Sequence, residues 1–276
     1  MKKKKRRLII LACVTALIIA FVLSPIFPYI RSLAVMKVYS PYCAKNSIME
    51  EKNIELNIPS GEGWYPFVMT YEADEAFSDY TGIPGTKLSI LYNFPDFSLK
   101  KGCSRFYDES SPYYSGFYGA YLVSRKDGKP YGFSKDINDP DESAIADIAK
   151  FDFFTLVLGD FGLKAQNHVF EYSLTDYDAN ESFLGYDGWT RISTDIKVNG
   201  ANHTKRGFCA SYLQYGEPNF PVSSDFAPIE MKSIVYAKYF PECDTAVFFY
   251  VLSPSEEVCE SCVQTILSKS TFKTEK

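Results

Sequence analysis

The sequence has few of the residues, and none of the short motifs, on which many common enzymes depend. Its 276 residues include only two histidines, His168 and His203, and neither has a partner at the spacing of a zinc ligand. The patterns HExxH and GxSxG are absent, and no glycine-rich phosphate loop occurs. Seven cysteines are too few for a disulfide scaffold of this length. The sequence therefore offers no recognisable catalytic constellation.

Acidic residues are missing from the first 49 positions, whereas six basic residues fill positions 2–7. The chain has 29 basic and 34 acidic residues, so the part after residue 7 keeps 23 basic residues and a net charge of −11. A basic end suits the anionic cytoplasmic face of a membrane. An acidic body repels nucleic acid, so no nucleic-acid partner is expected.

The chain does contain enough apolar material for a folded core. Hydrophobic residues make up 46% of it, aromatic residues 16% and charged residues 23%. This composition excludes a disordered tail, a coiled coil and a collagen-like fibre. The length suits one large domain or at most two.

An uncharged, mostly apolar run extends from Leu8 to Ile30. Its first 16 residues would span about 24 Å as a helix, and the continuation to Ile30 reaches the ~30 Å of a hydrocarbon core. The sequence thus predicts a basic cytoplasmic tail (1–7), a transmembrane signal anchor (8–30), a juxtamembrane linker (31–50) and an extracytoplasmic domain (51–276) of a single-pass cell-membrane protein. The alternative is cleavage of the run as a signal peptide, followed by secretion.

Several segments have the periodicity of strands. Trp189–Val198 alternates between apolar and polar residues, and the Asn199-Gly200 dipeptide after it is typical of a tight hairpin turn, with a partner strand expected around 208–215. The continuous apolar runs 234–240 and 245–252 favour central strands buried on both faces. Shorter strands are expected at 54–58, 65–71 and 87–92.

Two segments have the signals of helix starts. Asp139-Pro140 precedes a helical apolar pattern, and Ser253-Pro254-Ser255-Glu256 is a capping box. The second start leads into an apolar stripe of Val258, Cys259, Cys262, Val263, Ile266 and Leu267. The predicted fold class is α+β: an N-terminal transmembrane helix, then a mostly antiparallel sheet packed with helices, including one at the C-terminus.

Two stretches resemble a known fold. Ile58-Pro59 with Trp64-Tyr65 resembles the opening of the PsbP-type α/β/α sandwich, which is named after an extrinsic subunit of photosystem II. Val247–Leu252 with Pro254–Leu267 resembles the closing strand and helix of that fold. The resemblance covers about half of the body. Members of this fold have varied binding and assembly roles and mostly lack enzymatic sites, so the resemblance alone implies little about function.

Cys259 and Cys262 have the C-x-x-C spacing of thiol–disulfide oxidoreductases and zinc ribbons. Their position more than one turn into the predicted helix, on its apolar stripe, favours buried structural cysteines instead. Outside the cytosol the six cysteines at 43, 103, 209, 243, 259 and 262 permit three disulfides in 15 pairings. A bridge from Cys243 to Cys259 or Cys262 is expected first, because the loop and the last helix are neighbours in sequence.

Four oxygen-bearing residues have part of the spacing of a calcium loop. Asp176, Asp178 and Asn180 occupy positions 1, 3 and 5, and Asp187 occupies position 12. Position 6 is a glutamate, where the sharp turn of such a loop calls for glycine. The two interpretations are a calcium site and an acidic surface turn, and the second is favoured.

The segment 110–121 is rich in Tyr, Ser and Gly, a composition that suits an adaptable binding surface. Tyr113, Tyr114 and Tyr118 are the candidate binding residues. The same composition also suits a loop that enters a strand whose tyrosines line the core, and this second interpretation is favoured.

The functional hypothesis is a membrane-anchored extracytoplasmic domain for non-catalytic binding or assembly at the cell surface, with a protein or envelope ligand and no cofactor other than calcium. The alternatives are a thiol–disulfide oxidoreductase that uses Cys259 and Cys262, and an enzyme without a recognisable motif. Native thiol labelling distinguishes the redox enzyme from the binding domain.

Overall fold

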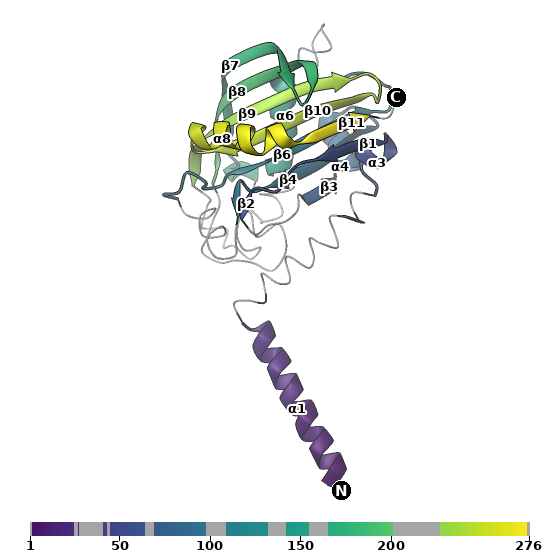
Figure 1. Ribbon diagram of the computed structural model, residues 1–276, viewed down its shortest axis with the longest axis vertical. Coiled ribbons are helices and arrows are strands. Elements are labelled where there is room, and N and C mark those ends of the chain that lie inside the picture. The colour runs from purple at the N-terminus through teal and green to yellow at the C-terminus, as the bar shows by residue number, and fades with distance from the viewer. Residues whose placement is uncertain are drawn as a thin grey trace.

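The computed structural model describes residues 2–24, 27, 41–42, 45–63, 69–97, 109–131, 142–154, 165–200 and 227–274. One seven-stranded sheet organises the fold, in the order β3-β4-β6-β10-β9-β8-β7 (Figure 1). Every neighbouring pair of its strands is antiparallel. The strands are β3 (Met69–Glu72), β4 (Thr86–Asn93), β6 (Phe117–Arg125), β7 (Phe170–Phe183), β8 (Tyr186–Asn199), β9 (Pro228–Phe240) and β10 (Thr245–Ser253).

The middle of the sheet consists of the most apolar strands. All residues of β10 are buried, and β4, β6 and most of β9 are buried as well. A strand covered on both faces can be apolar at successive positions rather than at alternate ones. The prediction of central strands at 234–240 and 245–252 is therefore confirmed.

The hairpin prediction after β8 is wrong. β8 pairs with β7 on one side and with β9 on the other, and Asn199 lies opposite Pro228 rather than in a two-residue turn. The Asn199 side chain instead bonds to the loop before β7: Oδ1 accepts from Val169 N at 2.7 Å, and Nδ2 donates to Asn167 O at 3.2 Å. Positions 208–215, the expected partner strand, lie outside the described residues.

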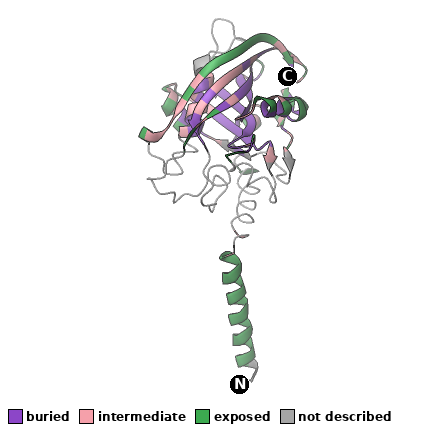
Figure 2. Cartoon of the chain, turned by 90° about the vertical axis from the view of Figure 1, so that its left-hand side faces the viewer, coloured by how far each residue is buried: buried purple, intermediate pink, exposed green. Residues whose placement is uncertain are grey.

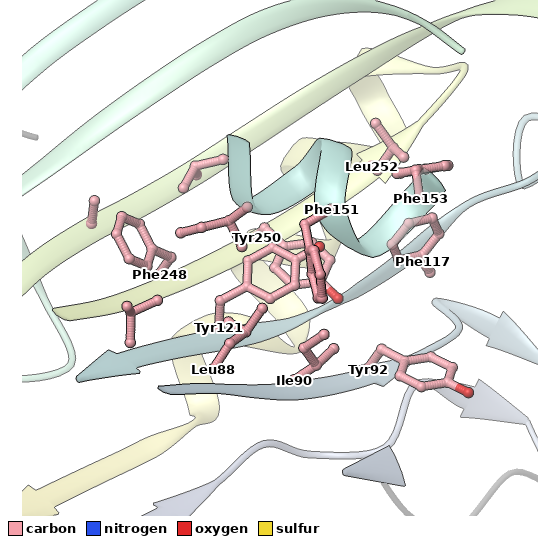
Figure 3. Packing of buried hydrophobic residues seen from close by; sticks show 14 of the residues in the cluster. Leu88, Ile90, Tyr92, Phe117, Tyr121, Phe151, Phe153, Phe248, Tyr250 and Leu252 are labelled. Atoms are coloured by element: carbon pink, nitrogen blue, oxygen red, sulfur yellow. The ribbon is translucent and has the colours of Figure 1, made fainter. Parts of the chain in front are cut away.

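Each face of the sheet has its own layer and its own core (Figure 1), and Figure 3 shows residues of one of these cores. One face packs against α4 (Asp74–Thr81) and α6 (Glu142–Phe151); we call its buried cluster the α6 core. The other packs against α3 (Ile48–Glu51), α8 (Glu256–Thr265) and the two-stranded sheet of β1 (Ile54–Asn57) with β11 (Thr271–Thr274); we call its cluster the α8 core. The α6 core includes Phe77, Tyr121, Ile148, Phe151, Phe153 and Tyr250, and the α8 core includes Trp189, Phe240, Phe249, Cys259, Cys262 and Leu267.

The remaining described elements are short. β2 (Glu62–Gly63) pairs in parallel with β5 (Asp96–Phe97), and two 3₁₀ turns, η2 (Ala165–Asn167) and η3 (Leu267–Lys269), precede β7 and follow α8. The predicted helix after Asp139 is present as α6, although positions 139–141 lie outside the described residues. Trp64 and Tyr65, half of the resemblance to the PsbP-type opening, lie outside them as well.

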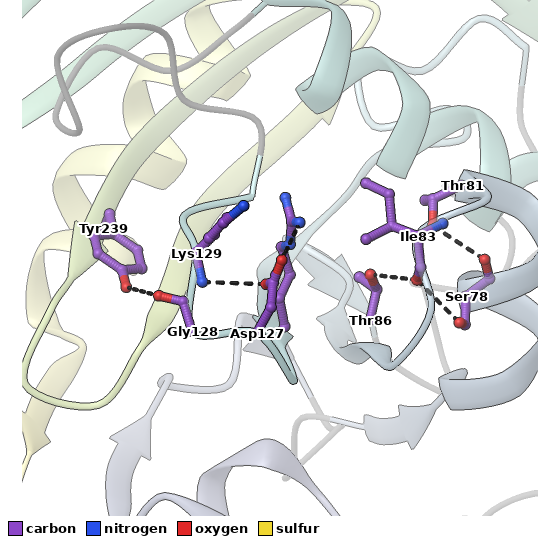
Figure 4. A network of polar contacts seen from close by, with 9 residues as sticks. Ser78, Thr81, Ile83, Thr86, Asp127, Gly128, Lys129 and Tyr239 are labelled. Carbon is purple, nitrogen blue, oxygen red and sulfur yellow. Dashed lines mark hydrogen bonds and ion pairs between the residues drawn. The ribbon is translucent and has the colours of Figure 1, made fainter.

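Polar contacts fix the turns at one end of the sheet (Figure 4). Beyond β6, the Asp127 carboxylate accepts from Arg125 Nε at 3.0 Å and from Lys129 N at 3.2 Å. Beyond α4, the carbonyl of Ile83 accepts from the hydroxyls of Ser78 and Thr86 at 3.0 and 2.8 Å. These bonds satisfy loop groups that would otherwise be left without partners beside the cores.

The C-terminal helix agrees with its prediction except at its cap. The N-cap is Ser255, whose hydroxyl accepts from Val258 N at 3.4 Å, and Ser253 instead donates to Pro112 O at 2.6 Å. The predicted apolar stripe, from Val258 to Leu267, is buried against the sheet throughout. The helical spacing of apolar residues thus identified the buried face of α8 correctly.

The transmembrane prediction for residues 8–30 is wrong. Helix α1 (Lys2–Val22) includes the six basic residues and ends at Val22, so its uncharged part spans only about 22 Å, less than a ~30 Å hydrocarbon core. Figure 2 shows this helix exposed along its length. Among the described residues, no helix has both the length and the apolar character that crossing a membrane requires. The fold is instead a mostly antiparallel sheet with few helices, without a transmembrane helix among the described residues. The predicted single-pass location in the cell membrane is therefore not supported.

The predicted linker 31–50 also ends too late. Its last residues belong to the fold, because Ile48 in α3 is only 1% exposed and is part of the α8 core. The backbone N–H of Ile48 donates to Ser89 Oγ of β4 at 3.0 Å. The folded body therefore begins before residue 48, while most of 31–44 lies outside the described residues.

Candidate functional site

The candidate redox cysteines are buried. Cys259 and Cys262 of α8 are 0% and 3% exposed, and Cys243 is also buried. All three are free thiols, so the expected bridge from Cys243 to Cys259 or Cys262 is not formed. Burial raises the pKa of the Cys259 thiol to about 12 and that of Cys262 well above its ordinary value. Since the thiolate is the reactive form, these groups are poorly suited to thiol–disulfide exchange. Cys43, Cys103 and Cys209 lie outside the described residues.

The candidate calcium ligands do not converge. Asp176, Asp178 and Asn180 lie along β7, and Asp187 lies at the start of β8. The Asp176 carboxylate pairs with Arg191 at 3.2 Å, while Asp187 accepts a hydrogen bond from Ser182. In the part of the chain that the structure describes, no group of three or more His, Cys, Asp or Glu residues could hold a metal ion.

Two of the candidate surface tyrosines lie in the core. Tyr118 is 0% exposed, and its hydroxyl donates to Pro59 O at 2.7 Å. Tyr114 is buried at the edge of the α6 core, and Tyr113 is half-buried in the turn before β6. This arrangement is the core interpretation of the segment rather than the surface one.

An apolar hollow lies between α6 and the sheet. Its volume is about 60 Å³, and its walls come from α6 and from strands β6 to β10. The walls consist almost entirely of apolar and aromatic side chains, as in most small-molecule sites. The lining residues are Phe117, Tyr121, Ile145, Ala146, Ala149, Phe153, Phe170, Tyr172, Ile192, Thr194, Ile196, Ser233, Val235, Tyr250 and Leu252.

A buried carboxyl group stands behind one wall of this cavity. The Tyr121 hydroxyl donates to Asp152 Oδ2 at 2.8 Å, and the ring of Tyr121 stacks on Tyr250 with centroids 4.4 Å apart (Figure 3). Burial raises the pKa of Asp152 to about 7, although the bond from Tyr121 acts in the opposite direction. A protonatable group, Asp152, is therefore bonded to Tyr121, one of the residues that line the cavity.

A cation lies beside the same walls. Lys150, in the last turn of α6, places Nζ 5.9 Å from the ring centroids of both Phe170 and Tyr172. Both rings line the cavity. Such contacts attract an ammonium group to the negative face of an aromatic ring and fix its position.

A second hollow, of about 110 Å³, lies beside the N-terminal half of α8 and is bordered by charged and hydroxyl side chains. Two ion pairs occupy this region: Lys232 with Asp195 at 2.7 Å, and Arg191 with Glu260 at 2.6 Å. Charges that are already paired inside the protein have less to offer a ligand. We therefore place the candidate site in the apolar cavity.

A further polar cluster ties α3 to the edge of the sheet. The Ser89 hydroxyl donates to Glu72 Oε2 at 2.6 Å and accepts from Ile48 N. Burial raises the pKa of Glu72 to about 8. Lys87 forms an ion pair with Glu51 of α3. The bonds of this cluster hold elements of the fold together, and neither hollow is lined by its members.

Sequence reasoning did not find the cavity. The apolar spacing of Ile145, Ile148 and Ala149 predicts the helix, but nothing in it shows which strands face that helix. The wall residues come from segments more than 100 positions apart, such as Phe117 and Leu252. Lys150 carried no signal of its own, because a lysine in the last turn of a helix is ordinary.

Comparisons with known proteins give no relative from which function could be transferred. No family model matches the chain, and neither a curated protein nor a solved structure matches it. The resemblance to the PsbP-type sandwich stays a prediction. The functional argument rests on the geometry of the site.

Proposed function

We propose that this protein is a non-catalytic binding protein that takes the apolar end of a small molecule into the cavity beneath α6. The observation that carries the proposal is the cavity itself: a hollow of about 60 Å³ with nearly continuous apolar walls inside an otherwise packed core. Protein interiors are close-packed, so a void of this kind costs stability unless something fills it. A ligand that enters it regains those contacts.

The cavity volume limits what can enter. A volume of about 60 Å³ is enough for the tip of a chain or part of a ring. The rest of the ligand would extend through the mouth. An apolar void does not hold water well, because water needs two or more polar partners.

The thiol–disulfide oxidoreductase is less well supported. The helix N-terminus activates a thiol when the cysteine lies in its first turn and faces solvent. Cys259 instead lies inside the α8 core, where its Sγ is 3.4 Å from Lys232 O. We therefore favour binding over redox catalysis.

The test is a titration of the full chain with 1-hexanol, followed by NMR at the methyl groups of Ile145, Ile196 and Val235, which line the cavity. We expect saturable shifts at these methyls. Ala149→Leu adds three carbons inside the cavity and should abolish the shifts. Ala76→Leu makes the same change on the exposed side of α4 and should leave them unchanged.

Two results would contradict the proposal. One is a wild-type protein whose cavity methyls do not respond to 1-hexanol. The other is an Ala149→Leu protein that still binds as the wild type does, since the alcohol would then occupy a different place.

A further inference from the structure

Resting on the proposed function, we infer that the ligand of the cavity is an anionic amphiphile: a small molecule with a short alkyl or aryl tip, and a carboxylate that pairs with Lys150 at the mouth. The ammonium group of Lys150 lies beside two rings of the cavity wall, and its surroundings favour this class of ligand.

The helical geometry places Lys150 next to the cavity. Ala146 and Ala149 of α6 both line the cavity, as does Phe153. Lys150 follows Ala146 by four residues, so it lies on the same side of α6 as this wall residue. Its contacts with Phe170 and Tyr172, which form the opposite wall, agree with this placement.

Within the described part of the chain, Lys150 has no ion-pair partner. Asp147, three residues earlier on α6, lies near Tyr80 and Tyr131, whose pKa values are raised mainly by burial and in addition by the charge of Asp147. The ammonium group is held by two aromatic rings and can receive an anion.

Three titratable groups that line or adjoin the cavity do not oppose an anion at pH 6. Asp152 has its pKa raised to about 7 by burial, so it is mainly protonated there. Tyr121 and Tyr250 have their pKa values raised well above the ordinary value by burial and are neutral. These three groups therefore add no negative charge near the Lys150 ammonium at this pH.

The size of the cavity sets the apolar part of the ligand. A void of about 60 Å³ takes only the tip of a chain, so the head of a short molecule stays near the mouth. A neutral molecule with the same chain gains the apolar contacts but not the ion pair. The preference between the two then measures the contribution of Lys150.

The experiment compares hexanoate with 1-hexanol at pH 6, using the same cavity methyls as the readout. We expect hexanoate to bind about two- to fivefold more tightly, the gain expected from a partly exposed ion pair. The advantage should shrink in 1 M NaCl, where charges are screened over about 3 Å. Lys150→Gln should reduce hexanoate binding to the level of 1-hexanol and leave 1-hexanol unchanged, while Lys150→Arg keeps the preference.

Lys269→Gln is the matched control, because it removes one exposed positive charge from η3 on the opposite face. If 1-hexanol binds and hexanoate shows no advantage, the inference is wrong and the proposed function stands. If the advantage survives Lys150→Gln, the assignment to Lys150 is wrong. If neither probe shifts the cavity methyls, the proposed function itself fails.

Discussion

The two faces of the central sheet are built from the same strands but solve the packing problem differently. On the face of the α8 core, which we call the closed face, aromatic rings of Trp189, Phe240 and Phe249 pack edge to face, with centroids less than 6 Å apart. The hollow beside α8 on this face is bordered mainly by charged and hydroxyl side chains. The indole N–H of Trp189 is buried there without a hydrogen-bond partner among the described residues. The α6 core instead keeps an apolar cavity, with a carboxyl group behind it and an ammonium group beside it.

The proposed binding site and the conspicuous cysteine motif therefore lie on opposite faces of one sheet. The closed face has the chemistry that the sequence made conspicuous, the C-x-x-C pair, and burial makes that pair inert. The open face has residues that are individually unremarkable. A function is therefore better sought where packing is incomplete than where a motif occurs.

The largest expected effect concerns the closed face. Because burial raises the pKa of Cys259 to about 12, the thiolate fraction at pH 7 is about a thousandfold below that of a thiol with the ordinary value. We expect Cys259 and Cys262 to resist a maleimide in the native protein at least a thousandfold more than exposed Cys13 does. Mass spectrometry of the labelled peptides measures this.

Labelling in guanidinium chloride is the control, since unfolding should make all three cysteines react alike. Native labelling of Cys259 or Cys262 as fast as Cys13 would show that the α8 face is open. It would also return the oxidoreductase to consideration.

The second prediction concerns the carboxyl group of the open face. The folded pKa of Asp152 is about 7, above the ordinary 3.8, so the folded state keeps a proton that the unfolded chain releases between those values. The free energy of unfolding should therefore fall as pH rises from about 4 to 7, by roughly 4 kcal/mol from this group. Asp152→Asn should remove that part of the slope. Urea unfolding at several pH values measures it.

The raised pKa of Glu72, about 8, gives a slope of the same sign, which Asp152→Asn keeps. Asp127→Asn is the control with a pKa shift of the opposite sign. The hydrogen bond from Arg125 lowers the pKa of Asp127, so removing this carboxylate should not flatten the fall of the free energy of unfolding with pH. Parallel curves for Asp152→Asn and the wild type would mean that Asp152 is ionised in the folded protein.

Sequence reasoning reached the elements that local rules determine. The stripe from Val258 to Leu267 predicted the buried side of α8, and continuous apolar runs predicted the central strands β9 and β10. It failed where a distant partner decides. Asn199-Gly200 looked like a turn, but Asn199 bonds to the loop before β7.

The same limit explains the candidate site. The apolar run after Leu8 predicts a membrane span, but the helix ends at Val22 and is too short for one. The cavity depends on Phe117, Ala149 and Leu252 meeting in space, and no spacing along the chain encodes that meeting. A local pattern predicts which face of an element is buried, but not how completely the burial fills space.

The smallest expected effect is the difference between two alanine-to-leucine variants, one on each face of the sheet. Ala120 of β6 is 0% exposed in the α8 core and lines neither hollow, so Ala120→Leu forces three carbons into filled space and should cost about 1–3 kcal/mol. Ala149→Leu places the same carbons in the cavity and keeps a good helix former, so the free energy of unfolding should change by less than about 1 kcal/mol. Urea unfolding of both proteins at pH 6 measures the difference. Equal losses would show that the α6 face is as closed as the α8 face, and the cavity would then have no room for a ligand.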